Sequence, residues 1–172
     1  MRTSRQQGRV FWITGLSGAG KTTLARALQR ALPGSLLLDG DELREALGAE
    51  ARGFDAESRR QLAQSYARLA GLLARQGATV IVATISLFHE LHAWNRANLP
   101  GYVEIFLDVP EELRRRRDPK GLYAANVRHM AGGEVKAELP LAPHLRLTGE
   151  ESLEAALALV LELAATPPGA RP

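Results

Sequence analysis

The sequence predicts a three-layer α/β fold built around a mainly parallel five-stranded sheet. Short apolar runs alternate along the chain with longer amphipathic stretches, a pattern typical of βαβ units. A glycine-rich segment, residues 15–20, lies between the first apolar run and the first amphipathic stretch. The length of 172 residues and the hydrophobic content of 45% suit one hydrophobic core. We therefore expect residues 1–172 to form a single domain.

The N-terminal part of the chain predicts two strands with a helix between them. Val10–Thr14 is continuously apolar up to its last residue, which predicts a buried strand. Residues 21–32 predict the first helix, and Pro33–Gly34 ends it. Leu36–Asp39 is rich in leucine and predicts the second strand, which ends in a carboxylate.

Two helices are expected next. Residues 41–47 predict a short helix with Asp41 as a plausible N-cap. Residues 57–76 predict a long amphipathic helix, and Gly77 ends it. The residues that recur there at helical spacing are Leu62, Tyr66, Leu69 and Leu73.

The middle of the chain continues the alternation. Thr79–Ala83 is apolar and rich in β-branched residues, which indicates a central strand. A helix is expected over residues 87–98, ended by Pro100–Gly101, and a strand over 102–107. Residues 110–117 predict a helix with proline in its first turn.

The last third is less regular. Residues 118–143 contain glycine and predict an irregular lid region with at most one helical piece near 122–130. Residues 144–147 predict a last strand, and 152–165 a last helix with Ser152 as its N-cap. The termini, residues 1–8 and 166–172, are expected to be flexible.

Composition excludes several classes of protein. The chain has no cysteine, which excludes disulfides, thiolate zinc sites and cysteine nucleophiles. The N-terminus lacks the apolar run of a signal peptide, and no stretch approaches the roughly 18 apolar residues of a membrane helix. The net charge of +3 fits an anionic ligand but is too small to argue for nucleic acid. We expect a cytoplasmic protein with no membrane or nucleic-acid partner.

The glycine-rich segment matches the phosphate-binding motif G-x-x-x-x-G-K-[ST] at every fixed position, between a strand and a helix. Its glycines let backbone N–H groups surround phosphate oxygens at a helix N-terminus. Lys21 can reach the β- and γ-phosphates, and the hydroxyl of Thr22 is placed to bind Mg²⁺. The sequence thus predicts a P-loop NTPase fold that binds ATP with Mg²⁺. The expected ATP contacts are Gly15, Ser17, Gly18, Ala19, Gly20, Lys21, Thr22 and Thr23.

The motif alone does not separate kinases from other NTPases. The chain lacks the guanine-reading N-K-x-D motif and has no room for a large switch apparatus. We therefore predict a small-molecule kinase. Asp39 and Asp41, at the end of the second strand, are candidates to orient the acceptor hydroxyl, with Arg44 one turn further as an anion clamp. The alternative is that the two carboxylates only cap a helix.

Three motifs in order give a resemblance to a known family. They are Gly15-Leu-Ser-Gly-Ala-Gly-Lys-Thr-Thr23, Leu38-Asp-Gly-Asp-Glu-Leu-Arg44 and Arg117-Asp-Pro-Lys-Gly-Leu-Tyr123. Together they resemble the motifs of the adenylylsulfate kinases, over about residues 10–147. The resemblance implies a P-loop kinase that uses ATP and Mg²⁺ to phosphorylate the ribose 3′-hydroxyl of a nucleotide.

The resemblance also implies roles for individual residues. Asp41 matches the residue that looks like the catalytic base, and Lys21 acts with it at the phosphates. Arg117 and Lys120 belong to the segment beside ATP. The matched acceptor-side residues, with Asp39, are Arg44, Phe54, Arg59 and Ser86, and Leu62 occupies an acceptor-contacting position. The family often forms dimers, so a homodimer is possible.

The acceptor side departs from the family pattern. Leu62 stands where the family has an asparagine, and Ile85-Ser-Leu-Phe-His89 replaces I-S-P-Y-R. The lid region lacks the F-T-G-I-D segment and is shorter. In a site that discriminates by hydrogen bonds, such changes alter which acceptor is satisfied. The chain therefore resembles either an atypical adenylylsulfate kinase or a relative tuned for another nucleotide.

Three alternatives stay open. Residues 82–96 look similar to a branch whose acceptor is cytidine diphosphoramidate, phosphorylated at the same hydroxyl. A regulatory protein that binds ATP without transfer is possible, although Asp41 and Arg44 argue against it. A nucleic-acid kinase is supported only by Arg114–Arg117, and this run also fits either a solvated helix face or a role near ATP.

The histidines do not predict a metal site. His89 and His92 lack a third metal ligand and are expected at the surface or the acceptor side.

Overall fold

The computed structural model describes residues 8–48, 55–117 and 137–166. The described strands form one sheet in the order β2-β3-β1-β4-β5, and every neighbouring pair is parallel. The predicted five-stranded sheet is confirmed, and it is parallel throughout. The strands are β1 (Arg9–Gly15), β2 (Leu36–Asp39), β3 (Thr79–Thr84), β4 (Val103–Leu107) and β5 (Leu145–Leu147).

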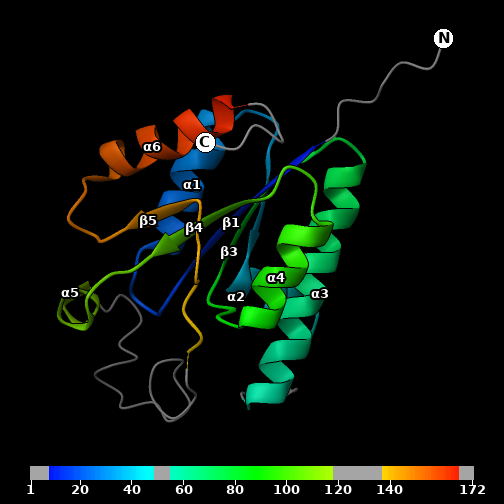
Figure 1. The fold of residues 1–172 in the computed structure, drawn as a ribbon, viewed down its shortest axis with the longest axis horizontal. Coiled ribbons are helices and arrows are strands. Elements are labelled where there is room, and N and C mark those ends of the chain that lie inside the picture. The colour runs from blue at the N-terminus through cyan, green and yellow to red at the C-terminus, as the bar shows by residue number, and fades with distance from the viewer. Residues whose placement is uncertain (1–7, 49–54, 118–136, 167–172) are drawn as a thin grey trace.

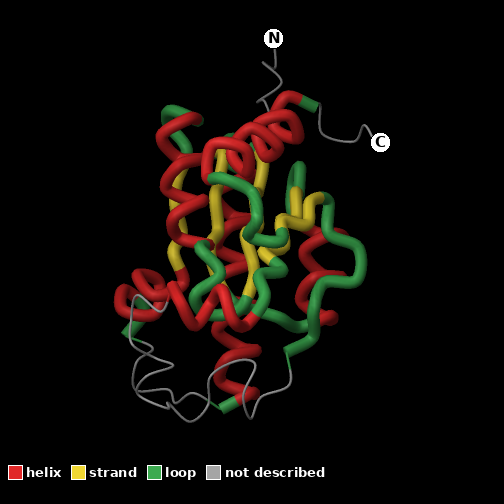
Figure 2. The backbone as a smooth tube through the Cα atoms, turned by 90° about the vertical axis from the view of Figure 1, so that its left-hand side faces the viewer, coloured by secondary structure: helices red, strands yellow, loops and turns green. Residues whose placement is uncertain are grey.

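Helices cover both faces of the sheet, which confirms the three layers. Figure 1 shows α1 and α6 on one face and α3 and α4 on the other, and Figure 2 shows the strands between them. The described helices are α1 (Lys21–Ala31), α2 (Gly40–Ala46), α3 (Ala56–Arg75), α4 (His89–Asn98), α5 (Glu111–Arg117) and α6 (Leu153–Ala165).

The alternation of side chains along β1 explains the two layers of core. Val10 and Trp12 pack on the side of α3 and α4, whereas Phe11 and Ile13 pack on the side of α1 and α6. All four are at most 1% exposed. A strand buried on both faces needs an uninterrupted apolar sequence, as predicted for residues 10–14.

Several element boundaries differ from the predictions by one or two residues. The helix predicted from residue 87 begins at His89, because Phe88 is extended at φ −134° and ψ 122°. The N-cap of α2 is Asp39, not Asp41, because the Asp39 side chain accepts from the Asp41 backbone N–H. The predicted cap at Ser152 is confirmed, since its side chain accepts from the Ala155 N–H.

The strand register brings the candidate residues to one edge. Thr14 pairs with Thr84, Asp39 pairs with Ala83, and Gly15 pairs with Leu107. The carboxyl ends of β1, β2, β3 and β4 therefore meet at the same edge, where ligands gather in open parallel sheets.

Some predictions concern parts of the chain outside the described residues. These are Phe54, Lys120, residues 1–7 and 167–172, and residues 118–136 of the predicted lid. That residues 1–172 form a single domain stays a prediction. Within the described ranges, no helix is long and apolar enough to cross a membrane.

Candidate active site

The glycine-rich loop turns closely over the start of α5. Gly18 has φ 78°, and a Cβ added there would lie 2.8 Å from the Arg114 backbone oxygen. Gly20 has φ 96° and is the N-cap of α1. Both positions require glycine for their left-handed backbone, and Gly18 requires it also for space. The loop therefore keeps its backbone N–H groups at the N-terminus of α1.

Lys21 folds back over this loop. Its Nζ donates to the Leu16 carbonyl at 2.9 Å, and the Ala19 N–H donates to the same carbonyl at 3.2 Å. These bonds place the ammonium group beside the loop backbone rather than in solvent. The structure thus places the predicted ATP contacts within residues 15–23 at the end of β1, on the loop that follows it and in the first turn of α1.

Asp39 joins the phosphate loop to the acceptor side. The Thr22 hydroxyl donates to Asp39 Oδ2 at 2.7 Å, and the Asp41 N–H donates to Asp39 Oδ1 at 3.0 Å. Asp39 is 4% exposed, whereas Asp41 is exposed at the start of α2. The sequence left open whether the carboxylates only cap a helix. Asp39 does cap α2, and it also holds the hydroxyl predicted to bind the metal.

Tyr66 is a site residue that the sequence did not identify. Its hydroxyl donates to the Gly40 carbonyl at 3.2 Å, between the two aspartates. Burial raises the pKa of Tyr66 to about 12, so the hydroxyl stays protonated and can donate. Helical spacing predicted only that Tyr66 faces the core. The only signal in the sequence was its position four residues after Leu62, which places both residues on one face of the helix.

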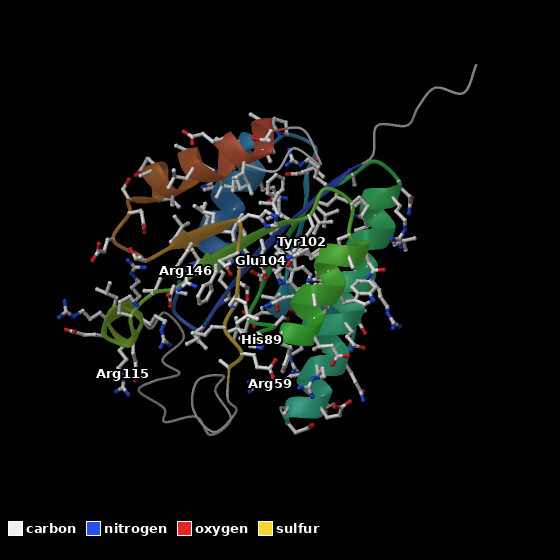
Figure 3. The ribbon with its side chains drawn as sticks, viewed as in Figure 1. Arg59, His89, Tyr102, Glu104, Arg115 and Arg146 are labelled. Atoms are coloured by element: carbon white, nitrogen blue, oxygen red, sulfur yellow. The ribbon has the colours of Figure 1, made fainter. Side chains whose placement is uncertain are left out.

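Arg44 and Arg59 bring two positive charges to the acceptor side. Both are partly buried, on α2 and α3. Burial lowers the pKa of Arg59, and the nearby charge of Arg44 lowers it further, while Asp55 opposes them. The two guanidinium groups are close enough to repel each other, so a ligand with several negative charges can interact with both. Figure 3 shows Arg59 and His89 at the same end of the molecule.

Two other predicted acceptor residues are buried. Leu62 is 7% exposed and belongs to the hydrophobic cluster under α3 and α4. Ser86 is 8% exposed and follows the carboxyl end of β3, beside the ends of β1 and β2. Ser86 is thus at the predicted edge, while the side chain of Leu62 packs in the core. Contact of either residue with an acceptor stays a prediction.

The sequence allowed two roles for the arginine run on α5, a solvated helix face or a position near ATP. Different arginines of the run fit each of them. Arg115 and Arg116 are exposed and pair with Glu111 and Glu112, and Arg115 points away from the sheet (Figure 3). Arg114 is 7% exposed and donates to the Val109 carbonyl at 3.0 Å and the Ser17 carbonyl at 3.5 Å.

Arg117, at the end of α5, faces a different segment. It donates to the Gly149 carbonyl at 3.1 Å and so connects α5 to the loop after β5. Arg114 and Arg117 are therefore the members of the run that contact backbone beside the predicted nucleotide site. The role of Arg117 in binding ATP stays a prediction.

The donors near Thr22 fit a magnesium ion that keeps most of its waters. Mg²⁺ prefers oxygen ligands and is usually held by one or two protein groups together with phosphates. The paired Thr22 hydroxyl and Asp39 carboxylate supply such oxygens at the edge of the loop. In the described part of the chain, no three histidine, aspartate or glutamate side chains cluster as a metal site.

The two histidines, which were expected at the surface or the acceptor side, lie in different surroundings. His92 is not at the surface, because it is 6% exposed between α4 and β4. Its Nε2 nevertheless lies 3.0 Å from the Ser86 carbonyl at the acceptor side. His89 is exposed, as expected, and its Nε2 lies 2.8 Å from the Leu139 carbonyl.

Comparison with known proteins agrees with this site. The model of the family described as adenylylsulphate kinase matches residues 7–148. The adenylyl-sulfate kinase of Deinococcus deserti is 43% identical over 154 residues, which cover 85% of this chain and 84% of the relative. The cytidine diphosphoramidate kinase of Campylobacter jejuni is 38% identical over 139 residues, which cover 76% of this chain and 81% of the relative.

A solved structure shows the same fold. The Mycobacterium tuberculosis APS kinase CysC in complex with AMPPNP and APS matches with a TM-score of 0.85 and 34% identity. The match covers 94% of this chain and 99% of that one. With the phosphate loop, the paired aspartates and the parallel sheet, these matches show that the chain belongs to the adenylylsulfate kinase family.

Proposed function

We propose that this protein transfers the γ-phosphate of ATP to the ribose 3′-hydroxyl of adenosine 5′-phosphosulfate. The observation that carries the proposal is the position of Asp39. One carboxylate oxygen holds Thr22 of the phosphate loop, and the other holds the backbone of Asp41. The predicted metal ligand and the predicted base are thereby fixed relative to each other, as a transfer reaction requires.

In the proposed reaction, an acceptor oxygen attacks the γ-phosphorus in line with the bond to the leaving ADP. Asp41, at the exposed N-terminus of α2, accepts the proton that the hydroxyl loses. The loop amides and Lys21 hold the phosphates, and Arg44 and Arg59 hold the anionic part of the acceptor. Positioning and charge neutralisation account for most of the rate.

Magnesium completes the proposed site. Thr22 would bind the ion directly, and Asp39 would hold the Thr22 hydroxyl and a bound water. When bound, the ion would supply positive charge that offsets the charge of the phosphates. The Thr22–Asp39 hydrogen bond of 2.7 Å supports this assignment, because it directs the hydroxyl hydrogen toward Asp39 and leaves the lone pairs of the Thr22 oxygen for the ion.

A second acceptor deserves the same test because the acceptor side departs from the family pattern. Leu62 packs in the core where the family has a polar residue, and Leu87, Phe88 and His89 follow Ser86 in place of P-Y-R. The Campylobacter jejuni relative is a cytidine diphosphoramidate kinase. That compound is the alternative acceptor, with the same transfer chemistry.

Steady-state ADP formation with ATP·Mg²⁺ and each acceptor in parallel separates the two. We expect kcat/KM to be higher for adenosine 5′-phosphosulfate by at least about tenfold, a difference of about 1.4 kcal/mol in transition-state binding. A higher value for cytidine diphosphoramidate would assign the protein to the second acceptor. If neither compound changes the rate of ADP formation, the protein binds ATP without transferring phosphate to either acceptor.

Location and assembly remain predictions. The cytoplasmic location and the homodimer were expected from the sequence and the family, respectively. Sedimentation of the purified chain would test the homodimer directly.

A further inference from the structure

A buried carboxylate on β4 has no place in the mechanism above. Glu104 is 1% exposed, on the side of the sheet that α4 covers (Figure 3). Burying a charged group in the core is costly unless it is paired. The partners of Glu104 therefore indicate why this position is not apolar.

The two oxygens of Glu104 face two different residues of α4. Arg96 Nη2 donates to Oε2 at 2.5 Å, and His92 Nδ1 lies 3.4 Å from Oε1. Arg96 also donates to the Ala142 carbonyl at 2.8 Å. Glu104 thus ties β4 to α4 through two side chains on one face of the helix.

The other ring nitrogen of His92 faces the acceptor edge. Nε2 lies 3.0 Å from the Ser86 carbonyl, and a carbonyl can only accept, so Nε2 must carry hydrogen. In the described part of the chain, neither Nδ1 nor Glu104 Oε1 makes a hydrogen bond of ordinary geometry, and the Tyr102 side chain is the other polar group that interacts with Glu104. A single proton between these two atoms satisfies both.

Burial favours the neutral form of both groups. Burial raises the pKa of Glu104, while Arg96 opposes this shift. Burial lowers the pKa of His92 to about 4, so its imidazole is neutral at pH 7. Arg96 donates to Glu104 Oε2 and His92 donates through Nε2 to the Ser86 carbonyl, while Glu104 Oε1 faces His92 Nδ1, so these contacts connect β4, α4 and the turn at Ser86.

Ser86 needs such support because its backbone is strained. Its φ of 31° makes it the one non-glycine residue with positive φ in the described ranges. A left-handed conformation is costly for a residue with a Cβ, and strained residues persist where their surroundings hold them. Two further bonds hold the turn: the Thr84 and Ser86 hydroxyls are 2.8 Å apart, and the Thr14 hydroxyl donates to the Ile85 carbonyl.

The turn at Ser86 lies between the two halves of the candidate site. Thr84 pairs in register with Thr14, directly before the phosphate loop, and Ala83 pairs with Asp39. A shift of this turn would therefore move backbone beside both the loop and the D-G-D segment.

We propose that His92 and Glu104 are positioning residues that fix the Ser86 turn and, through it, the nucleotide acceptor. The proposal rests on the proposed function, because an acceptor must bind at this edge. Neither side chain touches the reacting atoms. The other polar groups around the pair are Arg96 and His89 on α4, Tyr102 directly before β4, and His144 and Glu138 on residues 137–144.

The kinetic test compares His92→Phe with Glu104→Gln. Phenylalanine keeps the ring but cannot donate to Ser86, so H92F should raise the KM for the acceptor by about tenfold or more, as expected for a misplaced substrate. The KM for ATP should change less than about twofold, because the bonds of the phosphate loop remain. Glutamine can accept from Arg96 and donate to His92 Nδ1, so E104Q should stay close to wild type.

Asn95→Leu is the matched control. Asn95 is fully buried on the same helix, three residues after His92. N95L should lower the thermal midpoint without raising the KM for the acceptor. An unchanged acceptor KM in H92F, or an equal rise in N95L, would show that the cluster only stabilises the core and would overturn the proposal.

A second measurement needs neither an acceptor nor a variant. The ring ¹⁵N shifts of His92 in the wild-type protein should show a neutral imidazole with hydrogen on Nε2 at pH 7. A neutral imidazole with hydrogen on Nδ1 would contradict the bond to Ser86 and overturn the proposal, whatever the kinetics. If this tautomer is found while neither acceptor is phosphorylated, the proposed function fails and the assignment of the turn remains.

Discussion

At the scale of single residues, Asp39 and Asp41 differ in burial and in hydrogen bonding, although either carboxylate could bind a metal or accept a proton. Asp39 is buried and uses both oxygens within the protein, for Thr22 and for the Asp41 backbone. Asp41 is exposed at the start of α2, where the acceptor can reach it. The difference in burial supports the proposed metal-side role of Asp39 and the proposed proton-accepting role of Asp41.

Asp41→Asn should lower kcat by about 10²–10⁴-fold, because the amide cannot accept the proton of the hydroxyl. The affinity for ATP, measured by calorimetry, should change less than about twofold, since the phosphate loop is untouched. Glu42→Gln is the control: Glu42 is the next residue and makes an exposed ion pair with Arg26, and such pairs contribute little. Wild-type turnover in D41N would remove Asp41 from the mechanism.

Asp39→Asn should raise the Mg²⁺ concentration for half-maximal activity by roughly 10–100-fold, as for other residues that orient a metal ligand. Asparagine is as good an N-cap as aspartate, so α2 should keep its stability. Asp55→Asn makes the same change at the N-cap of α3, away from Thr22, and should leave the Mg²⁺ dependence unaltered. An equal Mg²⁺ dependence in D39N and the wild type would contradict the proposed metal site.

At the scale of elements, the packing of the phosphate loop on α5 is the feature that fixes the loop in the proposed nucleotide site. Arg114 donates to the Ser17 carbonyl, and its own backbone oxygen lies where a side chain at Gly18 would go. The loop therefore has a neighbour on each side: α1, which it caps, and α5, on which it rests.

Gly18→Ala should destabilise the protein by roughly 2–4 kcal/mol and weaken ATP binding. About 1–2 kcal/mol comes from the left-handed backbone, and the remainder comes from the overlap with Arg114. Gly34→Ala is the matched control, because Gly34 has φ 82° but open space around it. Urea unfolding of both variants should show the larger loss in G18A. Equal losses would mean that the contact with α5 contributes nothing.

The sequence predicted elements best where the local pattern was sufficient. The apolar runs at 10–14 and 79–83 and the fixed spacing of the glycines each depend on a few neighbouring residues. The start of α2 was misplaced because the choice of cap depends on Thr22, which lies on another helix. Tyr66 and His92 were underestimated, because their bonds to Gly40 and Ser86 exist only after the helices pack.

At the scale of the whole molecule, the buried titratable groups should make stability depend on pH. His92 has an ordinary pKa of 6.5, which burial lowers to about 4, so the unfolded chain binds its proton first as the pH falls. Stability linked to His92 is therefore present above pH 6.5 and is lost as the pH falls toward 4. The raised pKa of Glu104 acts in the opposite direction above its ordinary value of 4.5.

The variant E104Q removes the opposing carboxyl and isolates His92. The free energy of unfolding of E104Q should fall by about 1–3 kcal/mol between pH 6.5 and 4. The double variant E104Q/H92F should lose less over the same range, and His144, whose pKa burial also lowers, contributes equally to both. Equal losses in urea titrations of the two variants would mean that His92 titrates alike in the folded and unfolded protein.

The central claim, transfer of phosphate to adenosine 5′-phosphosulfate, is tested most directly by the fate of the γ-phosphate. The protein would be incubated with ATP·Mg²⁺ and the acceptor and followed by ³¹P NMR. We predict a new ribose 3′-phosphate signal that grows in step with ADP, one for one. ADP accompanied only by inorganic phosphate, with the acceptor unchanged, would contradict the account.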